Sequence, residues 1–275
     1  MISLQSIVRA TGGNRRKKTR LLKPVRPSRR SEVFYRGRLL ALVVQLKEVA
    51  RVELLPKLKA MEPGYSRDDA RWGDNLEGSF ARLSAIGAGA GVWALRQAHK
   101  VAELVLADVD ARLIVSIRQS LKVDIAGVLS RPSSIRDAMA SAVKNNVALI
   151  QNIPEQYVEK LQAAVYEALA EGLRYEDLAK EIERIGEVTE SRAKLIARDQ
   201  IGKLNSDFNR VRQTDLGIEE YEWSTSGDER VRDEHSGYDG QTYRWDTSPP
   251  DGHPGEAVNC RCVAIPKFKL DKPTQ

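Results

Sequence analysis

The chain has 275 residues, of which 41% are hydrophobic, 30% charged and 6% aromatic. This balance excludes a wholly disordered chain, and the length is enough for two folded units that each bury a core. The sequence contains no run that resembles a secretion signal or a membrane-spanning helix, so we expect a protein that starts in a cytoplasm.

The net charge of +6 is concentrated at the N-terminus. Residues 1–38 contain 12 lysines and arginines and one acidic residue, Glu32, which gives +11, whereas the other 237 residues carry −5. Such a segment predicts salt-sensitive, sequence-independent contact with double-stranded DNA. The same composition also suits a solvated tail or a segment that docks on an acidic protein. The expected DNA-contact residues are Arg15, Arg16, Lys17, Lys18, Arg20, Lys23, Arg26, Arg29 and Arg30.

Helices are predicted for most of the chain after this arm. Hydrophobic periodicity predicts a helix over residues 32–60, capped by Ser31, and a capping box at residues 66–69 opens another. The small residues at 84–91 indicate a bend or a close helix contact, and a long amphipathic helix is expected over residues 92–129. Pro132 ends it, since proline lacks the amide donor.

Further helices are predicted over residues 134–152, 154–171, 175–185 and 189–216. Pro154 is placed at the start of the second of these, and Gly217 ends the last one. Beyond Gly217 the chain is rich in turn-forming residues, and residues 218–223 and 262–265 predict short strands.

The predicted fold is therefore mainly α. It has an elongated helical body followed by a small C-terminal α+β module, with a disordered basic N-terminal arm. The expected segments are the arm at residues 1–30, the body at 31–186, the module at 187–266 and a tail at 267–275. Within the module, we expect the structural core to include Trp223, Asp228 and Asn259.

Four residues of the module could bind a metal ion. His235, His253, Cys260 and Cys262 offer two imidazoles and two thiolates, a common ligand set for zinc. Residues two apart on a strand face the same side, so both cysteines could approach one ion. The alternative is that the cysteines pack as small hydrophobic residues and the histidines hydrogen-bond loop carbonyls, because the ligand spacing matches no standard zinc motif.

A charged cluster beside His235 could also be catalytic. Asp228, Arg230, Arg232 and Asp233 lie within a few residues of it, and acids, a histidine and a metal are the components of a nuclease. Charged residues next to a turn more often form surface ion pairs, so we predict no catalytic residue and no enzyme activity.

An ordered series of motifs occupies the C-terminal part of the chain. The motifs are RYEDLAKEI at residues 174–182, SRAKLIARDQIGKLNSDFN at 191–209, GIEEYEWSTSGDERVRDEH at 217–235, DG at 239–240, HPG at 253–255 and NCRC at 259–262. Their order and spacing resemble the phage Mu F-like minor head protein family, the head morphogenesis proteins of tailed phages. The resemblance covers residues 157–266, which are 110 of the 275 residues. It departs from the family at Asp199 and Gln200, where many members carry Thr-Glu, so no role is assigned to that acidic position.

The resemblance implies a minor capsid protein that associates with the portal inside the procapsid and contacts packaged DNA during assembly or ejection. The implied partners are the portal protein, capsid and scaffolding components and packaged DNA, with no membrane. The implied location is the virion interior, after a period in the host cytoplasm during assembly. The alternative is a metal-dependent nuclease or toxin-like effector that is packaged in the virion. The basic arm lies outside the resemblance, so its DNA contact is not implied by it.

Overall fold

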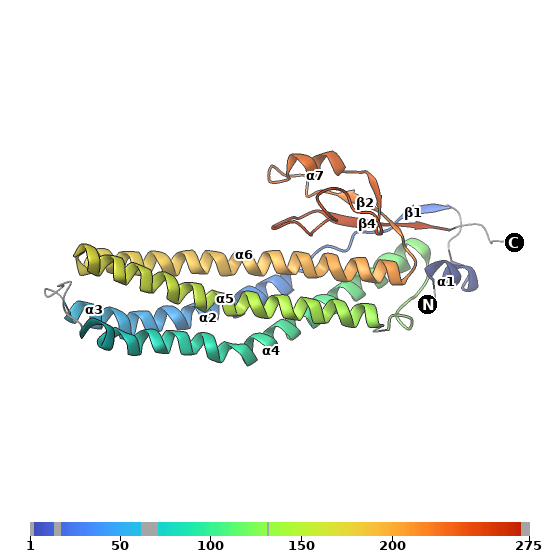
Figure 1. The fold of residues 1–275 in the computed structure, drawn as a ribbon. Helices are drawn as coiled ribbons and strands as arrows, with labels where there is room; N and C mark the ends of the chain where they lie inside the picture. Colours follow the sequence, from blue (N-terminus) through green and yellow to red (C-terminus); the bar gives the residue numbers. More distant parts are fainter. Residues whose placement is uncertain (1–2, 14–17, 62–70, 131, 271–275) are drawn as a thin grey trace. The chain divides into compact units, whose positions relative to one another are not determined.

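The computed structural model describes residues 3–13, 18–61, 71–130 and 132–270 (Figure 1). Helices dominate and a small sheet lies in the C-terminal part, so the predicted fold class of a mainly α protein with a C-terminal α+β part is confirmed. None of the described helices is both long and apolar enough to span a membrane. The helices are α1 (Leu4–Ala10), α2 (Arg29–Val49), the π-helix η1 (Ala50–Leu54), α3 (Leu55–Ala60), α4 (Arg71–Leu121), α5 (Ser133–Glu171), α6 (Tyr175–Asp215) and α7 (Asp233–Tyr238). The strands are β1 (Thr19–Leu21), β2 (Glu220–Ser224), β3 (Thr242–Arg244) and β4 (Val263–Lys269).

The chain divides into two compact units whose segments alternate along the sequence. The sheet unit contains Met1–Glu32, Lys100–Ala142 and Arg198–Gln275, and the helical unit contains Val33–His99 and Val143–Ala197. The segments predicted at residues 1–30, 31–186, 187–266 and 267–275 stay a prediction about functional organisation.

Polar contacts join the helices within the helical unit. Tyr35 of α2 donates a 2.8 Å hydrogen bond to the side-chain oxygen of Asn146 on α5, and both residues are buried. Lys47 of α2 forms a 2.7 Å ion pair with Glu190 of α6. Buried leucines along α2 and α3 supply the apolar contacts, so the unit is a helical bundle with polar links between neighbouring helices.

One predicted helix break in the helical unit is absent, and one predicted close contact is present. Helix α5 is continuous through Pro154, which was expected to begin a new helix. Helix α4 is likewise continuous through residues 84–91, where a bend or a close contact was expected. A close contact is found: a Cβ built on Gly87 would lie 3.3 Å from the Pro154 ring. Packing against a glycine therefore accommodates a proline that costs α5 one backbone hydrogen bond.

Helices predicted over residues 175–185 and 189–216 form the single helix α6. The hydroxyl of Thr189 donates a 2.8 Å bond to the Ile185 carbonyl, so this β-branched residue is accommodated within the helix. Gly217 ends the helix as predicted: its φ is +73° and the Ile218 amide donates to the Gln213 carbonyl at 2.8 Å.

The helix expected over residues 92–129 ends earlier than predicted, because α4 stops at Leu121. Lys122 has a φ of +60°, a left-handed conformation that interrupts the helix. Asp124 then accepts a 2.9 Å bond from the Ala126 amide and fixes a turn. The helix predicted over residues 32–60 is present as α2, η1 and α3 in direct succession, and the capping box at residues 66–69 lies outside the described residues.

The strands form one antiparallel sheet in the order β1-β4-β2-β3. Alternate residues of β2 face the core, and both Tyr221 and Trp223 are fully buried. Trp245, Cys262 and Ala264 complete this cluster. Figure 1 shows α7 and the C-terminal part of α6 on opposite sides of strands β2 and β4. The predicted metal ligands lie on α7 and in the loops next to this sheet.

The described part of the basic N-terminal segment differs from the disordered arm that its charge predicts. Leu4 and Val8 of α1 are fully buried, and the Leu4 amide donates a 2.8 Å bond to the Leu216 carbonyl at the end of α6. Strand β1 pairs with β4, and Leu22 and Val25 after it are also buried. Apolar residues spaced between the cations therefore hold this segment on the sheet unit.

A buried arginine connects three segments of the sheet unit. Arg212 of α6 is 3% exposed, and its Nε and Nη2 atoms donate to the two Asp110 carboxylate oxygens of α4 at 2.7 and 2.8 Å. Its Nη1 donates to the Ser130 carbonyl at 2.6 Å, in the loop that precedes α5. A bidentate pair of this kind is charge-assisted and geometrically specific, so it fixes the end of α6 just before β2 begins.

We predict that Arg212→Ala lowers the free energy of unfolding by about 3–5 kcal/mol, because it leaves the Asp110 carboxylate and the Ser130 carbonyl without their partner. Urea unfolding followed by circular dichroism measures this change. The matched control is Arg184→Ala on the same helix, which removes an exposed ion pair with Glu181 and should change the free energy of unfolding far less, because solvent screens that pair. Equal losses for the two variants would contradict the assignment.

Candidate functional site

The structure brings three of the four predicted metal ligands together. His235 Nδ1, Cys260 Sγ and Cys262 Sγ belong to a group whose ligand atoms all lie within 4.8 Å of one another. The imidazole Nδ1 is 3.6 Å from the Cys260 sulfur and 3.5 Å from the Cys262 sulfur. Both sulfurs therefore face the same ring nitrogen.

The three residues lie on a short helix and in the segment that leads into β4. His235 is on the short helix α7 and is 3% exposed. Cys262 is buried immediately before β4, and Cys260 is half-buried in the loop that leads to it. Cys260 and Cys262 are two residues apart in the segment that leads into β4, and both sulfurs lie on the side of His235.

Trp223 forms an apolar wall beside this group. Its ring lies 5.2 Å from the His235 ring, centroid to centroid, at an edge-on angle of 69°. Tyr238 packs edge-on against the same indole at 5.0 Å. Trp223 is fully buried, which places one predicted core residue at the centre of the module. The aromatic wall keeps water from that side of the cysteines and the histidine.

The two thiols have different proton affinities. A hydrogen bond from Cys262 lowers the pKa of Cys260 below the ordinary value of a thiol, and the nearby His235 acts in the same direction. The same hydrogen bond raises the pKa of Cys262 above its ordinary value, and burial adds to this effect. One thiolate is thus stabilised beside one thiol, which gives the group a soft, electron-rich donor.

His253, the fourth predicted ligand, is not in this group and has a different set of partners. Its Nδ1 lies 2.8 Å from the Tyr221 hydroxyl, and its ring is tilted against the Trp245 ring with the centroids 5.0 Å apart. The backbone of Trp245 also hydrogen-bonds the imidazole. The sequence spacing gave no signal that separates the two histidines.

Contacts with α6 hold the cysteine loop in place. The backbone amide of Asn259 donates a 2.7 Å hydrogen bond to the Asp199 carboxylate, and the Asn259 φ is +57°. At Gly255, which has a φ of +92°, an added Cβ would lie 2.7 Å from the Ser206 side chain. Asp199 therefore has a positioning role that sequence reasoning left unassigned. Its distance from Asn259 in the sequence concealed the contact.

Asp228 and Asn259 are exposed and do not pack in the core where they were expected. Asp228 forms an ion pair with Arg261, and this pairing lowers the pKa of its carboxyl group. Arg232 donates a 2.9 Å bond to the Val258 carbonyl. These polar side chains stabilise the loops around the cysteines by hydrogen bonds at the surface, because charged groups are costly to bury.

The structure describes only some of the predicted DNA-contact residues. Arg15, Arg16 and Lys17 lie outside the described residues. Arg20 donates a 2.6 Å bond to the Ser120 carbonyl and is half-buried. The other predicted contacts are exposed and have no ion-pair partner among the residues that the structure describes. They are Lys18, Lys23, Arg26, Arg29 and Arg30.

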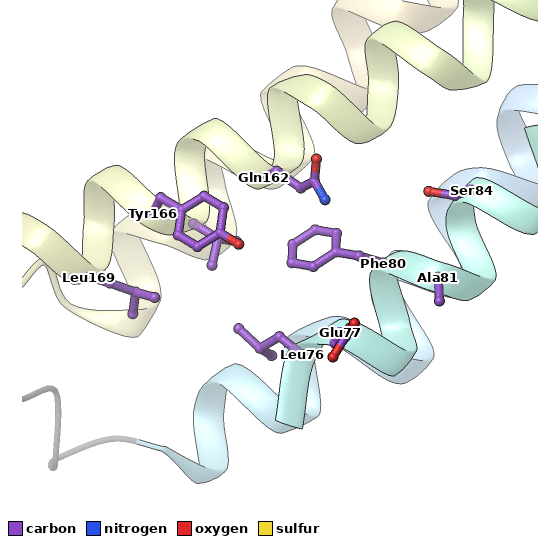
Figure 2. Close-up of a pocket in the computed structure, with 9 residues that line it drawn as sticks. Leu76, Glu77, Phe80, Ala81, Ser84, Gln162, Tyr166 and Leu169 are labelled. Carbon is purple, nitrogen blue, oxygen red and sulfur yellow. The ribbon is translucent and has the colours of Figure 1, made fainter. Parts of the chain in front are cut away.

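The helical unit contains a separate groove of about 440 Å³ between α4 and α5. Figure 2 shows Phe80 of α4 facing Gln162 and Tyr166 of α5 across it. Its described lining is mainly apolar, and the polar side chains there are Glu77, Ser84, Gln162 and the Tyr166 hydroxyl. This lining offers neither a metal-ligand set nor a nucleophile with an adjacent base.

Comparisons with known proteins identify one family. Residues 159–265 match the family described as phage Mu protein F like protein, which agrees with the resemblance in the sequence. A protein of Haemophilus influenzae (strain ATCC 51907 / DSM 11121 / KW20 / Rd), described only as uncharacterized, is 34% identical over 259 residues. The alignment covers 92% of this chain and 57% of that relative, so the chain spans little more than half of the relative's length. No solved structure matches.

His253 should make folding stability depend on pH. Burial is the main cause that lowers its pKa from 6.5 in the folded protein. As the pH falls below about 6.5, the His253 imidazole therefore becomes protonated in the unfolded chain before it does so in the folded chain. We predict that the free energy of unfolding decreases between pH 7 and about 5.5, and that His253→Asn, which keeps an acceptor for Tyr221, removes part of this decrease.

Urea unfolding at several pH values measures this effect. The matched control is His99→Asn, which removes an exposed histidine from α4. An unchanged pH dependence in His253→Asn, or an equal change in both variants, would show that the buried imidazole is not the source.

Proposed function

Because residues 159–265 belong to the phage Mu protein F like family, a family of phage head morphogenesis proteins, we propose that this protein is a minor head protein of a tailed DNA phage. The family match is the observation that carries the proposal. It includes the end of α5, all of α6, strands β2 and β3, the start of β4, and the cysteine and histidine residues beside them. The family region therefore takes in part of the helical unit and the buried aromatic cluster of the sheet unit.

The proposed role is structural. The protein would act in the host cytoplasm during assembly and then in the virion interior, where it associates with the portal protein and with capsid and scaffolding components. The charged residues beside His235 support a structural role over catalysis. Asp228 is paired with Arg261, and Arg232 is bonded to a backbone carbonyl, so both groups stabilise loops.

Contact with packaged double-stranded DNA is proposed for the basic N-terminal segment. Lys23, Arg26, Arg29 and Arg30 are exposed and unpaired among the described residues, in a stretch that begins two residues after β1. Unpaired cations can neutralise phosphates without first breaking an internal ion pair. Because buried apolar residues hold this stretch on the sheet unit, the cations form a fixed patch at the described positions.

The start of α2 adds a second argument for an anionic partner. Arg29 and Arg30 occupy its first turn, where the helix dipole is positive and two more positive charges are unfavourable by roughly 0.3–1 kcal/mol each. A bound phosphate would reverse this penalty, since helix N-termini and arginines both favour anions. The patch is therefore better suited to a polyanion than to bulk water.

Association with the head and the portal is tested directly. We predict that mass spectrometry detects the protein in purified heads with and without DNA, and that it co-sediments with purified portal. Absence from heads together with no portal binding would overturn the structural role. Metal-dependent cleavage of DNA or RNA by the purified protein would then favour the packaged nuclease or toxin-like effector.

The DNA contact predicts a change in salt dependence. Replacing Lys23, Arg26, Arg29 and Arg30 together by glutamine should weaken binding to duplex DNA equally for unrelated sequences. It should also reduce the slope of log K against log salt by about 0.9 for each phosphate contact that is lost. Fluorescence anisotropy over a series of salt concentrations measures both. Substitution is preferable to deletion here, because deletion would also remove β1.

A variant with the same loss of charge serves as the control. Arg96, Lys100, Lys144 and Lys160 are exposed and lie outside the basic segment, and their joint replacement by glutamine removes four positive charges elsewhere. If both quadruple variants reduce the slope equally, net charge alone explains the binding and the patch is not the contact.

A further inference from the structure

We propose that His235 Nδ1, Cys260 Sγ and Cys262 Sγ bind one Zn²⁺ ion, and that His253 is not a ligand. The sequence offered four candidate ligands, and the structure selects three of them by position. This inference does not depend on the proposed head function, since metal binding is a property of the purified chain.

The distances between the ligand atoms fit a tetrahedral zinc ion. Zinc bonds of about 2.3 Å to sulfur and about 2.0–2.1 Å to nitrogen, at the tetrahedral angle, place the two ligand atoms about 3.6 Å apart. The observed separations of His235 Nδ1 from the two sulfurs are 3.6 and 3.5 Å. An ion can therefore enter the group with little movement of the side chains.

The chemistry of the group also favours zinc over a hard cation. Two thiolates and an imidazole are soft or borderline donors, which select zinc rather than calcium or magnesium. A neutral imidazole has one lone pair on its unprotonated nitrogen, and in the tautomer that carries its proton on Nε2 this lone pair is on Nδ1, next to both sulfurs. When the ion binds, a cysteine that is still a thiol releases its proton to the buffer, so that both sulfurs coordinate as thiolates.

Burial explains why an ion would be retained. His235 and Cys262 are 3% and 6% exposed, and His235 Nε2 is buried with no hydrogen-bond partner among the described residues. An imidazole and two thiols held against Trp223 gain little from water. Cys260 is only half-buried, which leaves a path by which a water molecule supplies the fourth ligand.

The ion would fasten the cysteine loop to α7. This helix has six residues, too few to be stable without tertiary contacts. His235 is the residue by which α7 reaches both cysteines. Zinc bound there would link α7 to the residues that enter β4, and so would stabilise the C-terminal module as a unit.

The first experiment measures zinc in the untagged full chain after dialysis against metal-free buffer. We expect about one zinc per chain by mass spectrometry of the metal. The zinc X-ray absorption spectrum should show two sulfur ligands at about 2.3 Å and at least one nitrogen at about 2.0–2.1 Å. This measurement uses the unaltered protein, so it does not depend on whether a variant folds.

Variants then identify the ligands. Cys260→Ser, Cys262→Ser and His235→Asn should each lose most of the bound zinc, and they should lose the thiolate charge-transfer absorption of the cobalt-substituted protein or weaken it. His253→Asn is the matched control and should retain both. Chelation should lower the thermal unfolding midpoint of the unaltered chain and of His253→Asn, but not that of Cys262→Ser.

Several results would overturn the proposal. These are failure of the reduced protein to bind zinc or cobalt, a zinc spectrum with only nitrogen and oxygen ligands, and a disulfide between the two cysteines in protein purified under reducing conditions. Loss of zinc in His253→Asn equal to that in His235→Asn would overturn the assignment of ligands.

Discussion

The bidentate contact between Arg212 and Asp110 constrains the structure more than any other single interaction described. A guanidinium that is 3% exposed needs its partners, because an unpaired charge in that position would be strongly unfavourable. Arg212 meets this need with α4 and with the loop before α5, and the next residue, Gln213, accepts a 3.1 Å bond from the Trp245 indole. The end of α6 thereby sets where the chain turns at Gly217 and where β2 begins. The sheet and the residues that it carries depend on that starting point.

The sequence predicts the type of most elements because their patterns are local. Apolar residues at helical spacing predict α2 and α6, and alternate burial of Tyr221 and Trp223 follows from a strand pattern. Pro154 gave a wrong prediction of a helix start, because Gly87, the residue that accommodates it within α5, is distant in the sequence. The basic segment misleads in the same way. Its charge predicts disorder, whereas burial of Leu4 and Val25 depends on partners that no local pattern reveals.

The candidate site shows the same division between residue type and position. Residue chemistry alone identifies His235, Cys260 and Cys262 as candidate metal ligands. The sequence does not show which of His235 and His253 lies near the cysteines, because that depends on which aromatic side chain each imidazole packs against. His253 meets Tyr221 and Trp245, whereas His235 meets Trp223 and the two cysteines. The role of Asp199 was likewise hidden, because its partner is the Asn259 amide, a backbone group that has no signature in the sequence.

The pairing of β1 with β4 has a consequence for how the protein is made. Thr19 pairs with Lys269, so partner residues on the two strands are separated by 250 positions. During translation β1 leaves the ribosome long before β4 exists, and the sheet cannot close until almost all of the chain between them has been synthesised. In the meantime, the backbone groups of β1 that pair with β4 have no native partner. A chaperone that shields this segment during synthesis would therefore act on the stage of folding most exposed to aggregation.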